Sequence, residues 1–304
     1  MTDATHPPSG FTYRAAREAG IGRGVLQGTR FLAPFHGVRA ERYERHPDVD
    51  ELLRRCLWYL PRLREGQFFS HATALALYGA TVPPREERAL HVSVHRPSSP
   101  PRTRGVSGHR LQQRDPDVHL LGELPVEAPE RAWVQASRDW TTDELVVAAD
   151  HLVRRDRPLT TIRALTAEAL RMRGDVLGEP LSLVREGSES ARETLLRLVL
   201  VRAGLPEPEL NVPLRDTQGR TIARLDEAFP AYRVAVEYDG RQHAFSVSQF
   251  RRDADRWDAI RDAGWHLVRI LDHHLSPDPG IAVAKVRAAL IARGWKDHGR
   301  RFTL

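Results

Sequence analysis

The chain has 304 residues, enough for two domains that each bury a core of their own. Lys and Arg number 46 against 40 Asp and Glu, a net charge of +6, and 41% of the residues are apolar. This composition is typical of a globular protein and excludes a disordered or fibrous one. A single cysteine, Cys56, excludes a disulfide framework and a cysteine-based zinc site, and it favours a cytoplasmic location.

Membrane insertion and secretion are not expected. The longest strongly apolar stretch, Leu195–Leu205, is interrupted by Arg197 and Arg202 and is too short for a membrane span. Met1–Gly10 lacks the basic start and apolar core of a secretory signal. The sequence therefore predicts a cytoplasmic protein without a membrane partner.

The basic residues are almost all arginines. Only Lys285 and Lys296 are lysines, and both lie near the C-terminus. Arginine keeps its charge and binds phosphate groups with two parallel hydrogen bonds, but it is a poor proton carrier. Any mechanism that needs a lysine must therefore take it from the end of the chain.

Residues 1–48 have the pattern of a winged helix-turn-helix domain. Thr12 is placed to cap a short helix over Tyr13–Ala19, and a second short helix is expected over Gly24–Gly28. The segment 31–40 is expected to be extended, with a turn near Gly37. Two helices followed by a β-ribbon are typical of this DNA-binding domain. Three arginines are the candidates for DNA contacts on its groove-facing side: Arg23, Arg30 and Arg39.

Residues 49–180 are expected to form an α+β region, and the domain boundary is placed in the later part of Arg157–Glu186, among scattered prolines and glycines. Apolar spacing predicts helices and one alternating strand. The helices are expected over Val49–Leu63, Ser70–Tyr78 (capped by Ser70), Ala128–Ala136 and Thr142–Arg155, and the strand over Leu90–His95.

Histidines and arginines in this region leave alternatives open. His71 is interpreted as a capping or packed side chain in preference to a metal ligand. Alternation within the strand puts His91 and His95 on one face, but a zinc site needs two further ligands that the pattern does not locate. The segment Arg96–Arg114 has five arginines and no acid, which suits either an exposed loop or a nucleic-acid contact.

Residues 187–296 show the clearest pattern, with the element order αβββαβα. The last strand follows a strand–helix crossover and is expected to run parallel to a neighbour, so this domain is α/β with helices on the sheet. The helices are expected over Ser190–Ala203, Ser248–Ala263 and Ile281–Ala292, and the strands over Asn211–Arg215, Thr221–Asp226, Arg233–Asp239 and Trp265–Leu271.

Two acids of this domain are expected to face each other. If the hairpin is centred between Ala231 and Tyr232, Asp226 lies directly opposite Glu237. Like charges across a strand pair oppose folding, and burial raises carboxylate pKa values further. A divalent cation offsets this repulsion directly, which makes the pair a candidate metal site, with Glu193 as a possible third acid.

Ordinary ion pairs are the alternative for the same acids. Asp226 is able to pair with Arg224 or Arg269 in this sequence, and Glu237 with Arg252 or Arg256. Pattern alone does not choose between an ion and an arginine.

The segment Ser188–Ala292 resembles the PD-(D/E)XK nuclease superfamily, and within it the bacterial domains related to very-short-patch-repair endonucleases. The resemblance implies a restriction-endonuclease-like αβββαβ core, in which the first acid and the (D/E)XK acid bind Mg²⁺, or Mn²⁺ in its place, and orient a water for attack on a phosphodiester. The matching stretches are SARETLLRLVLVRAGLP with Glu193, ARLDEAFP with Asp226, VAVEYDGRQH with Glu237 and His243, and QFRRDADRWDAIRDAGWHLVRI with Arg252.

The sequence departs from the superfamily at the third motif position, where Asp239 replaces the lysine. Four residues are candidates to assist: Asp239 as a further ligand, His243 or Gln242 as a proton carrier or water-positioning group, and Arg252 as a phosphate-binding cation.

Residues 11–155 resemble the AbiEi-type antitoxin family, which joins a winged helix to an α/β region. The matching stretches are FTYRAAREAGIGRGVLQ, FLAPFHGVRA, FSHATALALYGA and LPVEAPERAWVQAS. The resemblance implies DNA binding and repression of the protein's own promoter, and it leaves a homodimer open. The function expected is therefore a metal-dependent endonuclease that binds DNA. The alternatives are a non-catalytic repressor or antitoxin-like protein with a degenerate nuclease fold, and a structural protein whose acids are all paired with arginines.

Overall fold

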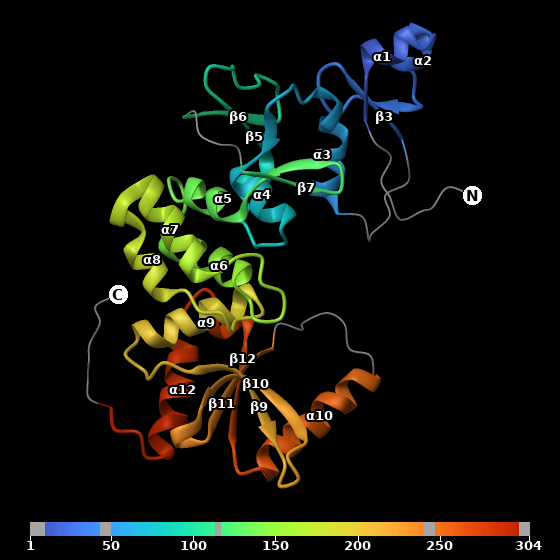
Figure 1. Cartoon of the computed structure of the whole chain (residues 1–304). Helices are drawn as coiled ribbons and strands as arrows, with labels where there is room; N and C mark the ends of the chain where they lie inside the picture. The colour runs from blue at the N-terminus through green and yellow to red at the C-terminus, as the bar shows by residue number, and fades with distance from the viewer. Residues whose placement is uncertain (1–9, 43–49, 113–116, 240–246, 298–304) are drawn as a thin grey trace. The chain divides into compact units, whose positions relative to one another are not determined.

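The computed structural model describes residues 10–42, 50–112, 117–239 and 247–297, without the side chains of 174–175 and 247–254. The chain divides into two compact units, each of which mixes helices and strands (Figure 1). The N-terminal unit comprises Met1–Ala148 and Leu159–Gly178, and the C-terminal unit comprises Ala149–Pro158 and Glu179–Leu304. The predicted α/β class is confirmed at this level. No helix in the described ranges combines the length and apolar character that crossing a membrane requires.

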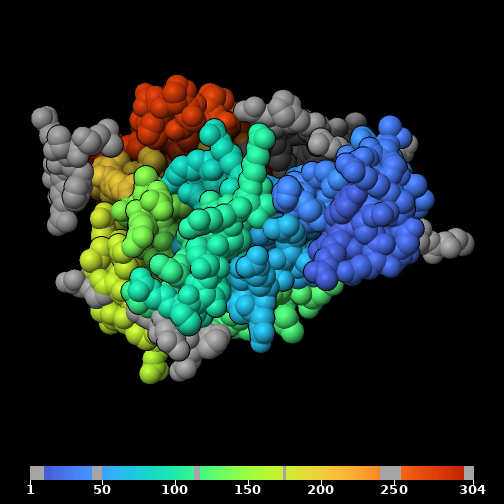
Figure 2. Space-filling model, turned by 90° about the horizontal axis from the view of Figure 1, so that it is seen from above, coloured from blue at the N-terminus to red at the C-terminus, as the bar shows by residue number. Residues whose placement is uncertain are grey.

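The N-terminal unit begins with two short helices and a small sheet of order β1-β3-β2. The Oγ1 of Thr12 accepts the backbone N–H of Ala15 at 3.1 Å, so the expected cap is present. Gly37 turns the chain before the last strand with a φ of +74°, which glycine adopts without strain. In Figure 2 this segment is the dark-blue lobe on the surface. Its elements are β1 (Phe11–Thr12), α1 (Tyr13–Glu18), α2 (Arg23–Gln27), β2 (Phe31–Leu32) and β3 (Val38–Glu41).

A five-stranded mixed sheet of order β6-β5-β4-β8-β7 forms the centre of the N-terminal unit. Only β5 was expected from the sequence. The neighbouring strand β6 shows no clear alternation of apolar and polar residues, because it contains an exposed glycine, Gly108, and one exposed polar residue, Arg110, at an edge of the sheet. The strands are β4 (Gln67–Phe69), β5 (Leu90–His95), β6 (Val106–Leu111), β7 (Val118–Leu121) and β8 (Leu124–Glu127), and β6 runs parallel to β5.

Helices cover this sheet, close to the expected ranges. Ser70 precedes α4 but makes no capping hydrogen bond, so its predicted role is wrong: the hydroxyl instead contacts His71 Nδ1 and accepts from Ser93. The indole of Trp133 is fully buried and donates to the carbonyl of Leu145, which ties α5 to α6. The helices are α3 (Glu51–Tyr59), α4 (His71–Leu77), α5 (Pro129–Ala136), α6 (Thr142–Leu152) and α7 (Ile162–Arg173), with 3₁₀ segments η1 (Leu60–Arg62), η2 (Glu86–Arg88) and η3 (Gly174–Leu177).

The C-terminal unit contains a four-stranded sheet of order β12-β11-β10-β9, and the expected parallel pairing of β11 with β12 is present. Helices α9 and α12 share one apolar cluster with the sheet, and Ile260 of α10 belongs to a second one. The elements are α8 (Gly178–Leu183), α9 (Ala191–Arg202), β9 (Glu209–Arg215), β10 (Thr221–Phe229), η4 (Pro230–Tyr232), β11 (Val234–Asp239), α10 (Val247–Asp262), β12 (His266–Leu271), α11 (Asp272–Leu275) and α12 (Gly280–Ala292).

A buried ion pair fixes the start of α9 in this unit. Arg197 Nη2 donates to Asp150 Oδ2 at 2.8 Å, and both side chains are 1% exposed. The same carboxylate accepts from the Thr194 hydroxyl at 2.9 Å and from the Arg185 backbone N–H at 2.7 Å. Because a buried charge needs such partners, removal of one member leaves the other uncompensated.

We expect Arg197→Ala to lower the free energy of unfolding by about 3–5 kcal/mol, because Asp150 then stays buried without its cation. Urea unfolding followed by circular dichroism measures this loss. The matched control is Arg220→Ala, which removes a 74%-exposed side chain paired with Asp216 and should cost far less. Equal losses in the two variants would contradict the assignment.

Candidate functional site

Asp226 and Glu237 come together across β10 and β11. The strands are antiparallel with Glu227 opposite Val236 and Ala228 opposite Ala235, and one further step in this register sets Asp226 opposite Glu237. The expected register is therefore confirmed. Glu237 is buried, and 25% of the Asp226 side chain is exposed. Two acids thus occupy adjacent positions in the middle of a sheet.

One arginine of α10 reaches both acids. Arg256 Nη2 donates to Glu237 Oε1 at 2.6 Å and lies 4.0 Å from Asp226 Oδ1. The same nitrogen donates to the backbone carbonyl of Arg224 at 2.7 Å. Of the arginine partners that the sequence left open for Glu237, the structure shows Arg256. Arg224 pairs instead with Glu189. The guanidinium supplies positive charge where a metal ion would otherwise be required.

The charge of Asp226 is still only partly balanced. Burial, followed by the nearby charges of Glu237 and Glu193, raises the pKa of Asp226 to about 7, and Arg256 and Arg224 oppose the rise. A carboxyl group with such a pKa holds its proton near neutrality until a cation arrives. Elevated carboxyl pKa values of this kind are common at functional sites.

Glu193 has a structural role at the start of α9. Its carboxylate accepts from the Ser190 hydroxyl at 2.8 Å and from the Glu189 backbone N–H at 2.9 Å, while Ser190 Oγ accepts the Glu193 N–H at 3.2 Å. The Ser190 side chain thus caps α9, and the Glu193 carboxylate is held by the Ser190 hydroxyl and the Glu189 N–H. Glu193 is near enough to raise the pKa of Asp226, but its oxygens already have donors.

Glu227 is a functional candidate that the sequence analysis missed. Its side chain is completely buried, and neither oxygen has a hydrogen-bond partner among the described residues. Burial raises its pKa far above the ordinary range, while Arg197 opposes that rise. Its place in the register, opposite Val236, was the available signal, because the β11 valines were expected to lie on a buried face.

Asp239, at the position of the family's lysine, pairs with Arg269 of β12. The guanidinium carbon of Arg269 lies 3.7 Å from the centre of the Trp257 ring, which holds this cation against α10. In the described residues, no ion pair joins Lys285 or Lys296 to the acids of the site. His243 lies outside the described residues, and Arg252 is on α10 with an undescribed side chain.

The arginines of the N-terminal lobe (the segment from β1 to β3) make different contacts. Arg39 donates to the carbonyls of Leu26 and Val38, both at 2.8 Å, so it holds the lobe together. Arg30 pairs with Glu41 at 3.0 Å. Arg23 is exposed on α2 and has no partner in the described part of the chain.

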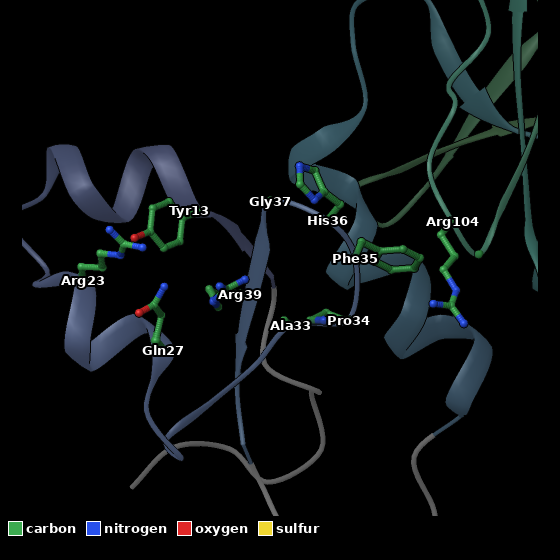
Figure 3. A pocket seen from close by; sticks show the side chains of 11 residues that line it. Tyr13, Arg23, Gln27, Ala33, Pro34, Phe35, His36, Gly37, Arg39 and Arg104 are labelled. Carbon is green, nitrogen blue, oxygen red and sulfur yellow. The ribbon is translucent and has the colours of Figure 1, made fainter.

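A groove of ≈ 1140 Å³ lies beside Arg23. Tyr13 and Gln27 line it next to Arg23, and Arg104 reaches it from the loop before β6, beyond Phe35 (Figure 3). Arg104 belongs to the basic segment 96–114, so the structure brings that segment to the same groove as the N-terminal lobe.

Comparison with known proteins finds two similar proteins from Mycobacterium tuberculosis. They are Rv2248 of strain H37Rv and MT2308 of strain CDC 1551, and both are called uncharacterized proteins. Each is 29% identical over 217 residues, which cover 70% of this chain and 78% of the relative. No family model matches the chain, and no solved structure matches it.

We expect the free energy of unfolding of Asp226→Asn to exceed that of the metal-free wild type by more at pH 8 than at pH 5. The folded pKa of Asp226 is about 7, whereas the unfolded chain ionises near 4. The wild type therefore loses stability as pH rises through this window, and asparagine removes that loss. The added advantage at pH 8 should be of the order of 1–2 kcal/mol.

Urea unfolding with a chelator present measures this difference. Asp216→Asn is the matched control of opposite sign, because hydrogen bonds from the backbone and the side chain of Arg220 lower the pKa of Asp216. That variant should lose stability at neutral pH. An advantage of Asp226→Asn that is the same at pH 5 and pH 8 would refute the elevated pKa.

Proposed function

We propose that this chain is a cytoplasmic DNA-binding protein whose C-terminal unit is a PD-(D/E)XK-like, Mg²⁺-dependent endonuclease. The observation that carries the proposal is the juxtaposition of Asp226 and Glu237 across β10 and β11. The helix–three-strand–helix–strand order and the parallel β11–β12 pair are those that the nuclease fold requires.

The acids fit a hard dication. Asp226 and Glu237 offer carboxylate oxygens, the ligands that Mg²⁺ prefers, and the pKa of Asp226 is raised first by burial and then by the negative charges of Glu237 and Glu193. When bound, the ion would make a water more acidic and stabilise the charge that develops on the phosphate. Asp226 and Glu237 would hold it, with Mn²⁺ as a substitute. Glu193 would fix α9 and add negative charge, and Arg256 would be released toward the phosphate.

Three further residues have smaller roles in this proposal. Asp239 is tied to Arg269, so it would position the end of β11 and leave ion binding to the other acids. His243 keeps its role as a proton carrier on sequence grounds alone, and Arg252 keeps its role as a phosphate contact.

A non-catalytic DNA-binding repressor with a degenerate nuclease fold is the second candidate. Two observations favour it: Arg256 already neutralises Glu237, and an aspartate stands where the nuclease lysine would be. In this candidate the acids and arginines would form a charge network that stabilises the sheet. The N-terminal lobe would then provide the function through DNA binding.

We expect the wild-type protein to nick supercoiled DNA in the presence of Mg²⁺ or Mn²⁺. Asp226→Ala and Glu237→Gln should lower the rate by about 100-fold or more, because a catalytic ion contributes several kcal/mol. The assay compares supercoiled, linear and mismatched DNA.

Asp258→Asn is the control, since Asp258 is an exposed acid of α10 paired with Arg261. It should cleave at the wild-type rate. If the wild type binds DNA without cleaving it, and Asp226→Ala binds with the same affinity, the result supports the repressor and contradicts the nuclease. If neither DNA nor metal changes the melting temperature, both candidates fail.

For the N-terminal lobe, we expect Arg23→Ala to weaken DNA binding severalfold and to reduce the salt slope of the affinity by about one, the signature of one lost phosphate contact. Arg14→Ala is the control, because Arg14 lies on α1 and pairs with Glu18. Fluorescence anisotropy over a range of NaCl concentrations gives both slopes. An unchanged slope in Arg23→Ala would remove Arg23 from the interface.

A further inference from the structure

Three histidines from separate elements of the N-terminal unit converge beside the five-stranded sheet. His71 begins α4, His91 lies on β5 and His109 lies on the edge strand β6. One ring nitrogen from each lies within 4.8 Å of the other two. Alternation along β5 puts His91 and His95 on one face, but His95 packs against Phe68, and His109 takes the expected place beside His91.

Backbone contacts hold the first two histidines in place. The Ser70 N–H donates to the carbonyl of His91 at 3.0 Å, and the His91 N–H donates to Thr73 Oγ1 at 2.8 Å. His71 adopts a φ of +49°, in the left-handed region that residues other than glycine rarely occupy. Strained residues of this kind are concentrated at functional sites.

The hydrogen bonds of His91 and His71 leave one nitrogen of each ring to face the cluster. His91 Nε2 lies 3.0 Å from the Glu86 carboxylate, which favours a proton on that nitrogen and a free lone pair on Nδ1. His71 Nδ1 contacts Ser70 Oγ at 3.0 Å, which leaves Nε2. A carboxylate behind a histidine is the usual outer partner of a metal-binding imidazole.

The spacing between rings suits a small ion. His91 Nδ1 lies 3.0 Å from His109 Nε2, and the corresponding separation around a tetrahedral zinc ion is about 3.3 Å. Without metal, these two nitrogens lie within hydrogen-bond distance of each other. The His71 and His109 rings stack with centres 3.9 Å apart, so the His71 ring must turn about its Cβ–Cγ bond to direct its lone pair at the same ion.

The three rings are largely shielded from water. Burial is the largest cause of their pKa shifts: it lowers the pKa of His109 to about 4, that of His91 below its ordinary value and that of His71 strongly. Arg138 adds positive charge that opposes a cation, whereas Glu86 and Asp139 add negative charge.

A pocket of ≈ 650 Å³ adjoins the cluster and gives an ion access to solvent. Its lining includes Glu127, whose side chain is 1% exposed and whose Oε2 has no hydrogen-bond partner among the described residues. Burial raises the pKa of Glu127 to about 8.

We propose that His71, His91 and His109 bind one late first-row divalent metal ion, with Zn²⁺ as the expected occupant and one coordination position open to the pocket. Imidazole ligands suit zinc, copper and nickel, whereas Mg²⁺ prefers oxygen. This site is therefore chemically distinct from the proposed Mg²⁺ site of the C-terminal unit. It joins the edge strand β6 to β5 and α4, and so holds the end of the basic segment 96–114.

The test is zinc binding to the full chain purified without a histidine tag. Isothermal titration with Zn²⁺ in excess Mg²⁺, with metal analysis after dialysis, should give one tight equivalent for the wild type. His109→Gln and His91→Gln should lose that equivalent, and Glu86→Gln should weaken it about tenfold or more. Zn²⁺ should raise the melting temperature of the wild type and not that of His109→Gln.

Two controls separate this site from other zinc-binding groups. His95→Gln, on the same strand, and Asp226→Ala, in the proposed nuclease site, should both keep the tight equivalent. X-ray absorption of the zinc-loaded wild type should count three imidazole ligands, a readout that holds even if a variant fails to fold. The proposal is overturned if the wild type binds no tight equivalent of Zn²⁺, or if folded His109→Gln retains it. Fewer than three imidazole ligands in the X-ray absorption spectrum would overturn it as well.

Discussion

Two carboxylates that face each other across β10 and β11 are the constraint on which the C-terminal unit depends. Asp226 and Glu237 are held in the middle of a sheet, where like charges repel and water is scarce. Arg256 meets both from α10, and its own position depends on the packing of that helix through Ile260. The register of the sheet, the packing of α10 and the charge balance of the site therefore depend on one another.

Buried charge recurs throughout the protein, and the chain balances it almost entirely with arginine. Asp150 is matched by Arg197 and Asp239 by Arg269. Within the described part of the chain, Glu127 Oε2 and both carboxylate oxygens of Glu227 have no hydrogen-bond partner, and burial favours the protonated forms of both acids. A guanidinium donates in several directions at once, so a single arginine satisfies a carboxylate and a backbone carbonyl together.

The two proposed ion sites differ in the chemistry of their ligands. The C-terminal unit presents carboxylate oxygens, which suit a hard ion, and the N-terminal unit presents imidazole nitrogens, which suit a softer one. Glu86 behind His91 and Glu193 at the start of α9 act outside the ligand sets, through orientation and charge. Each site is built within one unit, so neither requires the other for its geometry.

The sequence by itself determined the four strands, the three long helices and, once the hairpin centre was assumed, the register of the C-terminal unit. With that centre between Ala231 and Tyr232, Asp226 falls opposite Glu237, which is the register of β10 and β11. Local spacing also located α9, because such signals act within a few residues of the chain. For the same reason, the long β5 was foreseen and the polar edge strand β6 was not.

Only the tertiary structure decided which distant groups meet. It pairs Arg256 with Glu237, buries Glu227 without a hydrogen-bond partner among the residues described, and places His109 beside His91 on two neighbouring parallel strands. Contacts between segments far apart in sequence are set by packing and by competition among many similar arginines, and a local pattern of residues contains no information about the outcome of that competition.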